Sequence, residues 1–178
     1  MVCKALQKRE PVMALWMELE PEFGEEWRNR AVAAAAWLSE AASVADLGCG
    51  TMKLEECLRP DQVYLPVDLI ARDARTRILD LNSLSDLARL PVANACAMLG
   101  VLEYSYVPDE LVAALRPHYR QVVATFSVIC YETPDWRLEQ GWVNHFTRQE
   151  VAELFVRHGF KLMREHNFQG RQHMFDFR

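Results

Sequence analysis

The stretch "VADLGCGTMKLEECL", from Val44 to Leu58, decides the fold of this chain. Its first residues read as a buried strand, the two glycines at 48 and 50 as a tight turn, and residues 52–58 as a helix. Glycine lets a ligand approach the backbone closely, and the free N–H groups of a helix start favour a carboxylate or phosphate. The stretch therefore predicts a strand–turn–helix unit that either holds a nucleotide-like ligand or serves only as a packed structural turn.

Strand and helix patterns alternate after this unit. Apolar runs predict strands, and amphipathic runs predict helices. Asp109 is the expected N-cap of the helix at 108–117. The strands are expected at 62–69, 77–82, 94–102 and 121–129, and the helices at 82–90 and 108–117. This order predicts an α/β protein with a mostly parallel sheet.

The C-terminal third predicts a capped helix and a hairpin. Thr147 and Glu150 have the spacing of a capping box, and Gly159 suits the position just after the helix end. The segments 160–168 and 171–178 then read as strands without a helix between them, so they are expected to pair antiparallel. The sheet should therefore contain one antiparallel strand near the C-terminus.

The 178 residues are enough for one domain, with N-terminal helices within 1–40 capping the site and an α/β core over 43–178. The net charge of −5 argues against binding nucleic acid through a basic face. No apolar run is long enough to span a bilayer and no signal peptide is evident, so we expect a cytoplasmic protein. Five cysteines without metal-ligand spacing suggest reduced thiols and no metal site.

In parallel sheets, ligands lie beyond the carboxyl ends of the strands. Asp46 and the turn Gly48-Cys49-Gly50 end the first strand. Asp68 and Leu69 end the second, about twenty residues later, where an aspartate can accept hydrogen bonds from ribose hydroxyls or decorate an exposed turn. Asp80 and Leu81 end the third, where they could read an adenine edge or form an Asx turn.

The fourth strand ends in "MLGVLEY". Leu99 and Gly100 suit the floor of a pocket. Glu103 and Tyr104 follow on a loop, where they are either pocket groups or surface decoration.

Together these motifs resemble those of class I S-adenosylmethionine-dependent methyltransferases. The segments that carry the resemblance are "VADLGCGT", "YLPVDL", "ILDLN", "LGVLEY" and "FTRQEVAELFVRHGFKLMRE". The resemblance implies a Rossmann-like seven-stranded sheet with helices on both faces. It also implies that Asp46, Gly48, Cys49 and Gly50 line the methionine end of the cofactor, Asp68 and Leu69 the ribose, Asp80 and Leu81 the adenine, and Leu99 and Gly100 the sulfonium.

The glycine turn departs from two familiar patterns. Dinucleotide sites need a third glycine for close helix packing at the position that Lys53 occupies here, so NAD or FAD is disfavoured. The methyltransferase pattern usually has a glycine where Met52 stands. S-adenosylmethionine has no phosphate and needs only a few N–H donors, and we expect Met52 to begin the helix.

Methyl transfer requires alignment of the acceptor with an already activated methyl group, and a base only where the acceptor must lose a proton. His145 is the first candidate base, unless local backbone groups satisfy it; Glu103 and Tyr104 are others. Tyr131 and Trp142 could form a wall for the acceptor, and Trp16 could act as a lid or pack in the core.

The leading hypothesis is a methyltransferase for a small-molecule acceptor, with a homodimer possible. The alternative is a non-catalytic module that keeps the fold and binds the cofactor or a protein partner. A nicotinamide oxidoreductase is a third option. The same fold serves many acceptors, so the resemblance does not identify this one.

Overall fold

A single seven-stranded sheet runs through the chain, with strands in the order β3-β2-β1-β4-β5-β7-β6. The computed structural model describes residues 17, 24–129 and 136–178. The strands are β1 (Ser43–Leu47), β2 (Val63–Asp68), β3 (Arg77–Ile78), β4 (Ala95–Leu99), β5 (Gln121–Ser127), β6 (Leu162–Gln169) and β7 (Gln172–Phe177). The helices are α3 (Gly24–Trp37), α4 (Leu84–Leu87), α5 (Pro108–Leu115), α6 (Trp136–Glu139) and α7 (Arg148–Arg157), with 3-10 turns η2 (Glu55–Cys57) and η3 (Leu102–Tyr104).

The strand directions confirm the predicted fold class. Strands β1 to β5 pair in parallel, whereas β7 lies antiparallel between β5 and β6. Because β2 and β4 flank β1 on opposite sides, the order of the sheet reverses at β1. The loops that leave β1 and β4 therefore diverge and open a crevice at the carboxyl ends of the strands.

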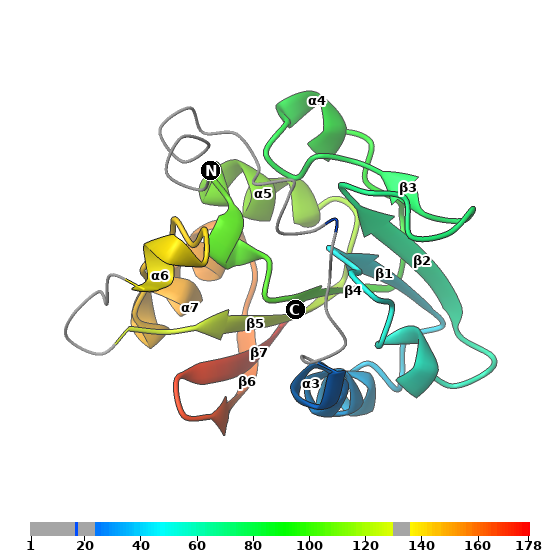
Figure 1. Cartoon of the computed structure of the whole chain (residues 1–178), viewed down its shortest axis with the longest axis horizontal. Helices are drawn as coiled ribbons and strands as arrows, with labels where there is room; N and C mark the ends of the chain where they lie inside the picture. Colours follow the sequence, from blue (N-terminus) through cyan, green and yellow to red (C-terminus); the bar gives the residue numbers. More distant parts are fainter. Residues whose placement is uncertain (1–16, 18–23, 130–135) are drawn as a thin grey trace.

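Alternate residues of each strand face two separate cores. On one face, α3 packs its alanines and Leu38 over Val44, Val123 and Met174. On the other face, α5 and α7 cover a larger cluster that includes Leu47 and Phe126. Figure 1 shows α3 on one side of the sheet and α4 and α5 on the other. Within the N-terminal region predicted to be helical, α3 is thus confirmed, while residues 1–16 and 18–23 lie outside the described residues.

The prediction of a helix after the glycine turn is wrong. Residues 52–58 form only the three-residue 3-10 turn η2, and Met52 has a φ of 57° and so does not begin a helix. Residues 48–62 connect the two strands, and Met52 stands in a left-handed conformation that a right-handed helix does not contain. The residues that remain before Pro60, which disfavours helical geometry at Arg59, allow no more than about two helical turns.

The helix ends test two further predictions. The capping box of α7 is confirmed, with Thr147 Oγ1 accepting from Glu150 N and the Glu150 carboxylate accepting from Thr147 N. Asp109 is not the N-cap of α5, because Pro108 occupies the first helical position and Val107 precedes it. Asp109 lies in the first turn and pairs with Arg157 of α7.

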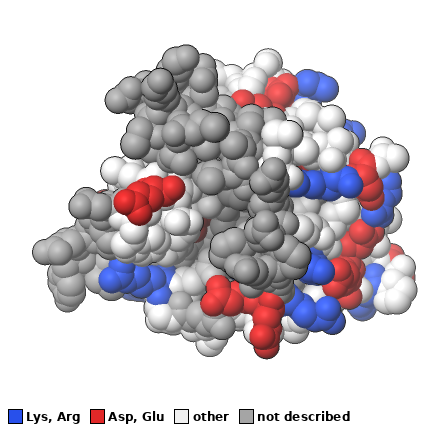
Figure 2. All heavy atoms as spheres, viewed as in Figure 1, with Lys and Arg blue, Asp and Glu red and all other residues white. Residues whose placement is uncertain are grey.

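Acidic and basic side chains are intermixed on the surface around β2, β3 and η2. Figure 2 shows both signs close together on the side of the view where these elements lie. The ion pairs there include Arg75 with Glu55, Arg59 with Asp61 and Arg28 with Glu56. In the ranges that the structure describes, no helix is long and apolar enough to cross a membrane.

Replacing Gly48 by alanine should destabilise the protein more than replacing Gly170. Both glycines have positive φ, 74° and 56°, which costs an alanine roughly 1–2 kcal/mol. A Cβ on Gly48 would also lie 2.7 Å from Val101 Cγ2, whereas a Cβ on Gly170 meets no atom within 4 Å. We expect a further loss of about 1–3 kcal/mol in Gly48→Ala, measured by urea unfolding. Equal losses in the two variants would contradict the close packing of Val101 on the turn.

Candidate functional site

A cavity of about 530 Å³ opens where the carboxyl ends of β1, β2 and β4 meet. Its wall includes every residue that the sequence assigned to a cofactor. These are Asp46, Gly48, Cys49, Gly50, Asp68, Leu69, Asp80, Leu81, Leu99 and Gly100. Met52 is not among the lining residues, so its side chain leaves the space free. The fold thus gathers onto one surface residues from four separate strand ends.

The glycine turn is fixed to the end of β2 by its backbone. The N–H groups of Gly48 and Cys49 both donate to Val67 O, at 2.8 and 3.0 Å. Gly50 N donates to Asp68 Oδ2 at 2.8 Å. With no α-helix behind it, the turn owes its shape to these bonds and to the left-handed conformations of its glycines.

Asp68 is held from several sides. Its Oδ1 accepts from Ile70 N at 3.1 Å, and Arg72 Nε lies 3.5 Å from its Oδ2. The side chain is 7% exposed and faces the cavity. Its carboxylate is therefore both part of the turn and a hydrogen-bond acceptor at the cavity surface.

Asp80 forms the Asx turn that the sequence left open, and it also lines the cavity. Its Oδ1 accepts from Asn82 N at 2.9 Å, which closes an Asx turn, and its backbone N donates to Asp86 Oδ2. The residue nevertheless lines the cavity, next to Leu81. An Asx turn here orients the residue at the cavity edge and does not remove it from the site.

Asp46 lies on the α3 face of β1, buried beneath the cavity. Its Oδ2 accepts a hydrogen bond from the Tyr64 hydroxyl at 2.7 Å. Burial raises the pKa of Asp46 to about 7, while the Tyr64 hydrogen bond and the charge of Arg30 act in the opposite direction. The carboxyl thus suits a cationic ligand group, which would favour its ionised form.

Arg30 of α3 is a site residue that the sequence reading missed. Its guanidinium projects into the cavity, where a Cβ on Gly100 would lie 2.9 Å from its Nη1. Its Nε is buried with no hydrogen-bond partner within the described residues. Desolvation lowers the pKa of Arg30, against the attraction of Glu103, Tyr104 and Asp46. The only signal in the sequence was an arginine directly before the buried alanines of a helix.

Glu103, on η3, marks the other end of the cavity. The residue is 1% exposed, and its Oε1 accepts from Ser127 N at 2.8 Å. Its Oε2 is also buried but has no hydrogen-bond partner in the described parts of the chain. Burial raises the pKa of Glu103, and the Ser127 hydrogen bond and the charges of Arg30 and Arg137 counteract this.

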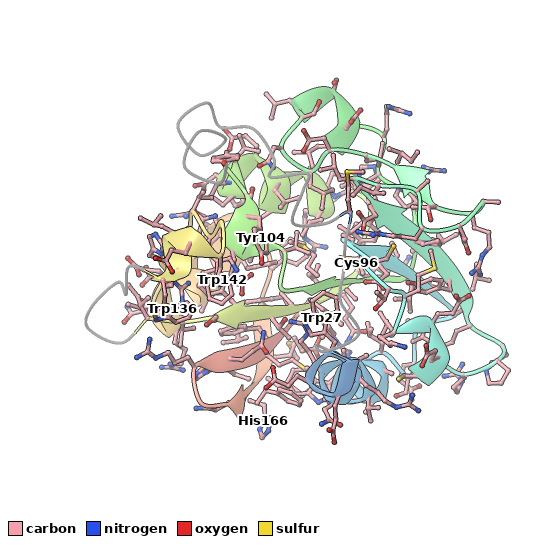
Figure 3. All side chains as sticks on the ribbon, in the orientation of Figure 1. Trp27, Cys96, Tyr104, Trp136, Trp142 and His166 are labelled. Carbon is pink, nitrogen blue, oxygen red and sulfur yellow. The ribbon has the colours of Figure 1, made fainter. Side chains whose placement is uncertain are left out.

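Three aromatic rings form a row beside Glu103. Trp142 Nε1 donates to Tyr104 Oη at 2.7 Å, and the two rings meet edge to face with centroids 6.5 Å apart. Trp136 lies at 5.4 Å from Trp142 on the other side. Figure 3 shows this row running from Tyr104 to α6, with Trp27 on α3 at a different part of the opening. All four residues line the cavity.

His145 does not line the cavity. Its Nδ1 accepts a hydrogen bond from Arg137 Nε at 3.2 Å, and desolvation and the Arg137 charge lower its pKa. Arg137 is fully buried, donates to Ser127 Oγ and Asn144 O, and lies 4.6 Å from the centre of the Trp142 ring. His145 thus supports the buried arginine behind the aromatic row.

Tyr131 and Trp16, the other predicted acceptor contacts, lie outside the described residues, as does Cys130. Cys49 and Cys96 are buried free thiols. Among the described residues, no group of three or more histidine, cysteine, aspartate or glutamate side chains could hold a metal ion.

No protein-family model matches the chain, and no curated protein matches it in sequence. The similar solved structures include the mitomycin 7-O-methyltransferase, at TM-score 0.65 and 17% identity over 85% of this chain. Human N-acetylserotonin methyltransferase, in complex with S-adenosylmethionine, matches at 0.67 and 17% over the whole chain. The Burkholderia thailandensis 1,6-didemethyltoxoflavin-N1-methyltransferase, with its acceptor and S-adenosylhomocysteine bound, matches at 0.75 and 16% over 98%.

These similarities show that the chain has the class I S-adenosylmethionine-dependent methyltransferase fold. The chain spans 53% and 56% of the length of the first two structures and 88% of the third. At these sequence identities the comparison concerns the arrangement of the sheet and helices.

The raised pKa of Asp46 predicts a stability that falls with pH. An aspartate in an unfolded chain has a pKa of about 4. At pH values between about 4 and about 7, the Asp46 carboxyl is therefore ionised in the unfolded chain but still protonated in the folded protein. The free energy of unfolding should therefore fall across this range and level off above it, with an Asp46 contribution on the order of 1–3 kcal/mol. Urea unfolding at pH 5 and pH 8 should show a smaller fall in Asp46→Asn than in the wild type. The exposed Asp61→Asn is the control, and an unchanged fall in Asp46→Asn would contradict the assignment.

Proposed function

We propose that this protein transfers the methyl group of S-adenosylmethionine to a small-molecule acceptor. The observation that carries the proposal is a continuous cavity at the switch point of the sheet, which joins the glycine turn, Asp68 and Asp80 at one end to Glu103 at the other. A second candidate function, a non-catalytic module that binds the cofactor, is favoured by the absence of an α-helix after the glycine turn.

The adenosyl part would lie across the ends of β1, β2 and β3. Asp68 would accept hydrogen bonds from the ribose hydroxyls, since its carboxylate is oriented by Gly50 and Ile70 and faces the cavity. Asp80 would accept from the adenine amino group, and Leu81 N would donate to a ring nitrogen. The apolar side chains of Leu69 and Leu81 would contact the flat faces of the adenine.

The methionine part would lie between β1 and α3. Asp46 would pair with its ammonium group, and Arg30 with its carboxylate. Charge-assisted bonds of this kind are stronger than neutral ones, and they are stronger still where water is excluded. Arg30 thus takes the role that the sequence reading assigned to a helix N-terminus, which the structure lacks.

The bound cofactor would supply a methyl group already activated by its sulfonium. The chain must then orient the acceptor, exclude water and, for an O–H or N–H acceptor, take up a proton. Glu103 Oε2 is the free, buried oxygen at this end of the cavity and is the base we propose. Tyr104 would position Trp142 through their hydrogen bond.

The proposal of a small-molecule acceptor has support from the similar structures. By their names, these proteins methylate a mitomycin, N-acetylserotonin and a toxoflavin precursor. The row of aromatic rings beside Glu103 also offers ring surface that suits a small aromatic ligand.

Calorimetry with S-adenosylmethionine and S-adenosylhomocysteine tests the proposal. The wild type should bind both, and Asp68→Ala should bind about 10- to 150-fold more weakly, the range for losing hydrogen bonds to a charged group. Asp61→Ala, at the exposed start of the segment leading to β2, should bind as the wild type does. No binding of either ligand at millimolar concentration would refute the proposed function. Binding without turnover across a broad acceptor panel would favour the non-catalytic candidate.

Replacing Arg30 should weaken binding of the amino-acid part of the cofactor but not binding of its adenosyl part. Arg30→Met should weaken S-adenosylhomocysteine at least about ten-fold but leave 5′-methylthioadenosine unchanged, because the latter lacks the amino-acid part. Arg28→Met is the matched control, since Arg28 lies on the same helix and pairs with Glu56 at the surface. Equal weakening of both ligands in Arg30→Met would show that Arg30 acts through the fold and not on the carboxylate.

A further inference from the structure

The acceptor end of the cavity holds one buried oxygen that needs a donor. Glu103 Oε1 is satisfied by Ser127 N, whereas Oε2 has no partner among the described residues and no exposure to bulk water. A buried carboxylate oxygen left unpaired is costly, more so than a neutral group. A ligand that presents an O–H or N–H at this point would remove that cost.

The aromatic row beside Glu103 offers ring surface and few polar groups. The one donor of the Trp142 indole is already used by Tyr104 Oη. Trp136 continues the row to the mouth of the cavity, where it is 42% exposed. Flat aromatic ligands gain most from such a wall, because offset and edge-to-face ring contacts stabilise them beyond the area they bury.

The charges around this end disfavour a cationic ligand. Arg137 lies 4.6 Å from the centre of the Trp142 ring and already makes a cation–π contact with it. Both Arg30 and Arg137 act on the Glu103 carboxylate, so its negative charge is partly balanced by the protein. A cationic ligand would lie near Arg30, which lines the cavity, and would pack on a Trp142 ring that already has the charge of Arg137 behind it.

We propose that the methyl acceptor is a neutral, flat aromatic compound whose O–H or N–H donates to Glu103 Oε2 while its ring packs against Trp142 and Trp136. This inference rests on the proposed function, since it assumes that the adenosyl cofactor fills the other end of the cavity. It adds a chemical class for the acceptor and names Glu103 and Trp136 as the residues that select it.

Four related compounds test separately the three properties proposed for the acceptor, which are a flat aromatic ring, a neutral charge and an O–H or N–H donor. The probe is 2-naphthol, which is flat, neutral and carries a donor. Its comparators are 2-methoxynaphthalene without the donor, decahydro-2-naphthol without the flat ring, and 2-naphthylmethylamine with a positive charge at pH 7. In calorimetry with saturating S-adenosylhomocysteine, 2-naphthol should bind at least about ten-fold more tightly than each comparator.

Two variants then test which residues are responsible for these binding preferences. In Glu103→Gln, the amide oxygen can keep the Ser127 bond and the NH₂ group replaces Oε2, so the preference for 2-naphthol over 2-methoxynaphthalene should fall at least about ten-fold. Glu139→Gln, the same change at an exposed site on α6, should keep the preference. Trp136→Leu should lower the preference for 2-naphthol over decahydro-2-naphthol, and it should leave the ratio of the two naphthalenes unchanged. Thermal melts of each variant establish that it is folded.

The outcomes separate this inference from the proposed function. Equal binding of 2-naphthol and 2-methoxynaphthalene, or a preference that Glu103→Gln leaves intact, would overturn the inference. So would binding of S-adenosylhomocysteine with no binding of any naphthalene. If S-adenosylhomocysteine itself does not bind, the proposed function fails, and the same titrations without it decide whether Glu103 and the aromatic row select flat donors.

Discussion

The hydrogen bond from Gly50 N–H to the Asp68 carboxylate is the contact on which the site depends. It joins the turn after β1 to the end of β2, directly beside the point where the sheet changes direction. The same carboxylate is oriented by Ile70 N and lies close to Arg72. The glycine turn therefore has a defined shape although no α-helix follows it, and the carboxylate that defines it also faces the cavity.

The short connection after β1 changes what the rest of the molecule must provide. Because no long helix follows β1, α3 is the only one of the described α-helices that contributes buried side chains to the core on its face of the sheet. The same helix carries Arg30 to the end of β4, beside Gly100. One helix thus covers the core and supplies the positive charge that a helix N-terminus would otherwise bring to this part of the cavity.

Local patterns were sufficient for the sheet and for the residues that line the end of the cavity beside the glycine turn. Strand runs, the capping box of α7 and the C-terminal hairpin are short-range features, and parallel strands must bring their carboxyl ends to one edge. The sequence could not show that residues 52–58 form only a 3-10 turn, because Met52 takes a left-handed conformation that its residue type does not signal. Arg30 and Arg137 were missed for a related reason: each reaches the site through tertiary packing, and nothing in its neighbouring sequence marks it. The sequence also could not show that His145 lies outside the cavity lining, because nothing near a histidine in a long connection signals that a buried arginine donates to its Nδ1.

The position of β7 has a consequence for the order in which the protein can fold. Every residue of β5 is buried, and β7 covers its outer edge, yet β7 is the last strand of the sheet to be synthesised. Until then β5 exposes an unpaired edge of apolar residues, the kind of surface that associates with other chains. The turn that precedes β7 also contributes Arg171 to the cavity wall and accepts Val128 N at Arg171 O. The part of the cavity wall that Arg171 contributes can therefore form only after the hairpin has docked, whereas the glycine turn and Asp68 can meet much earlier in synthesis.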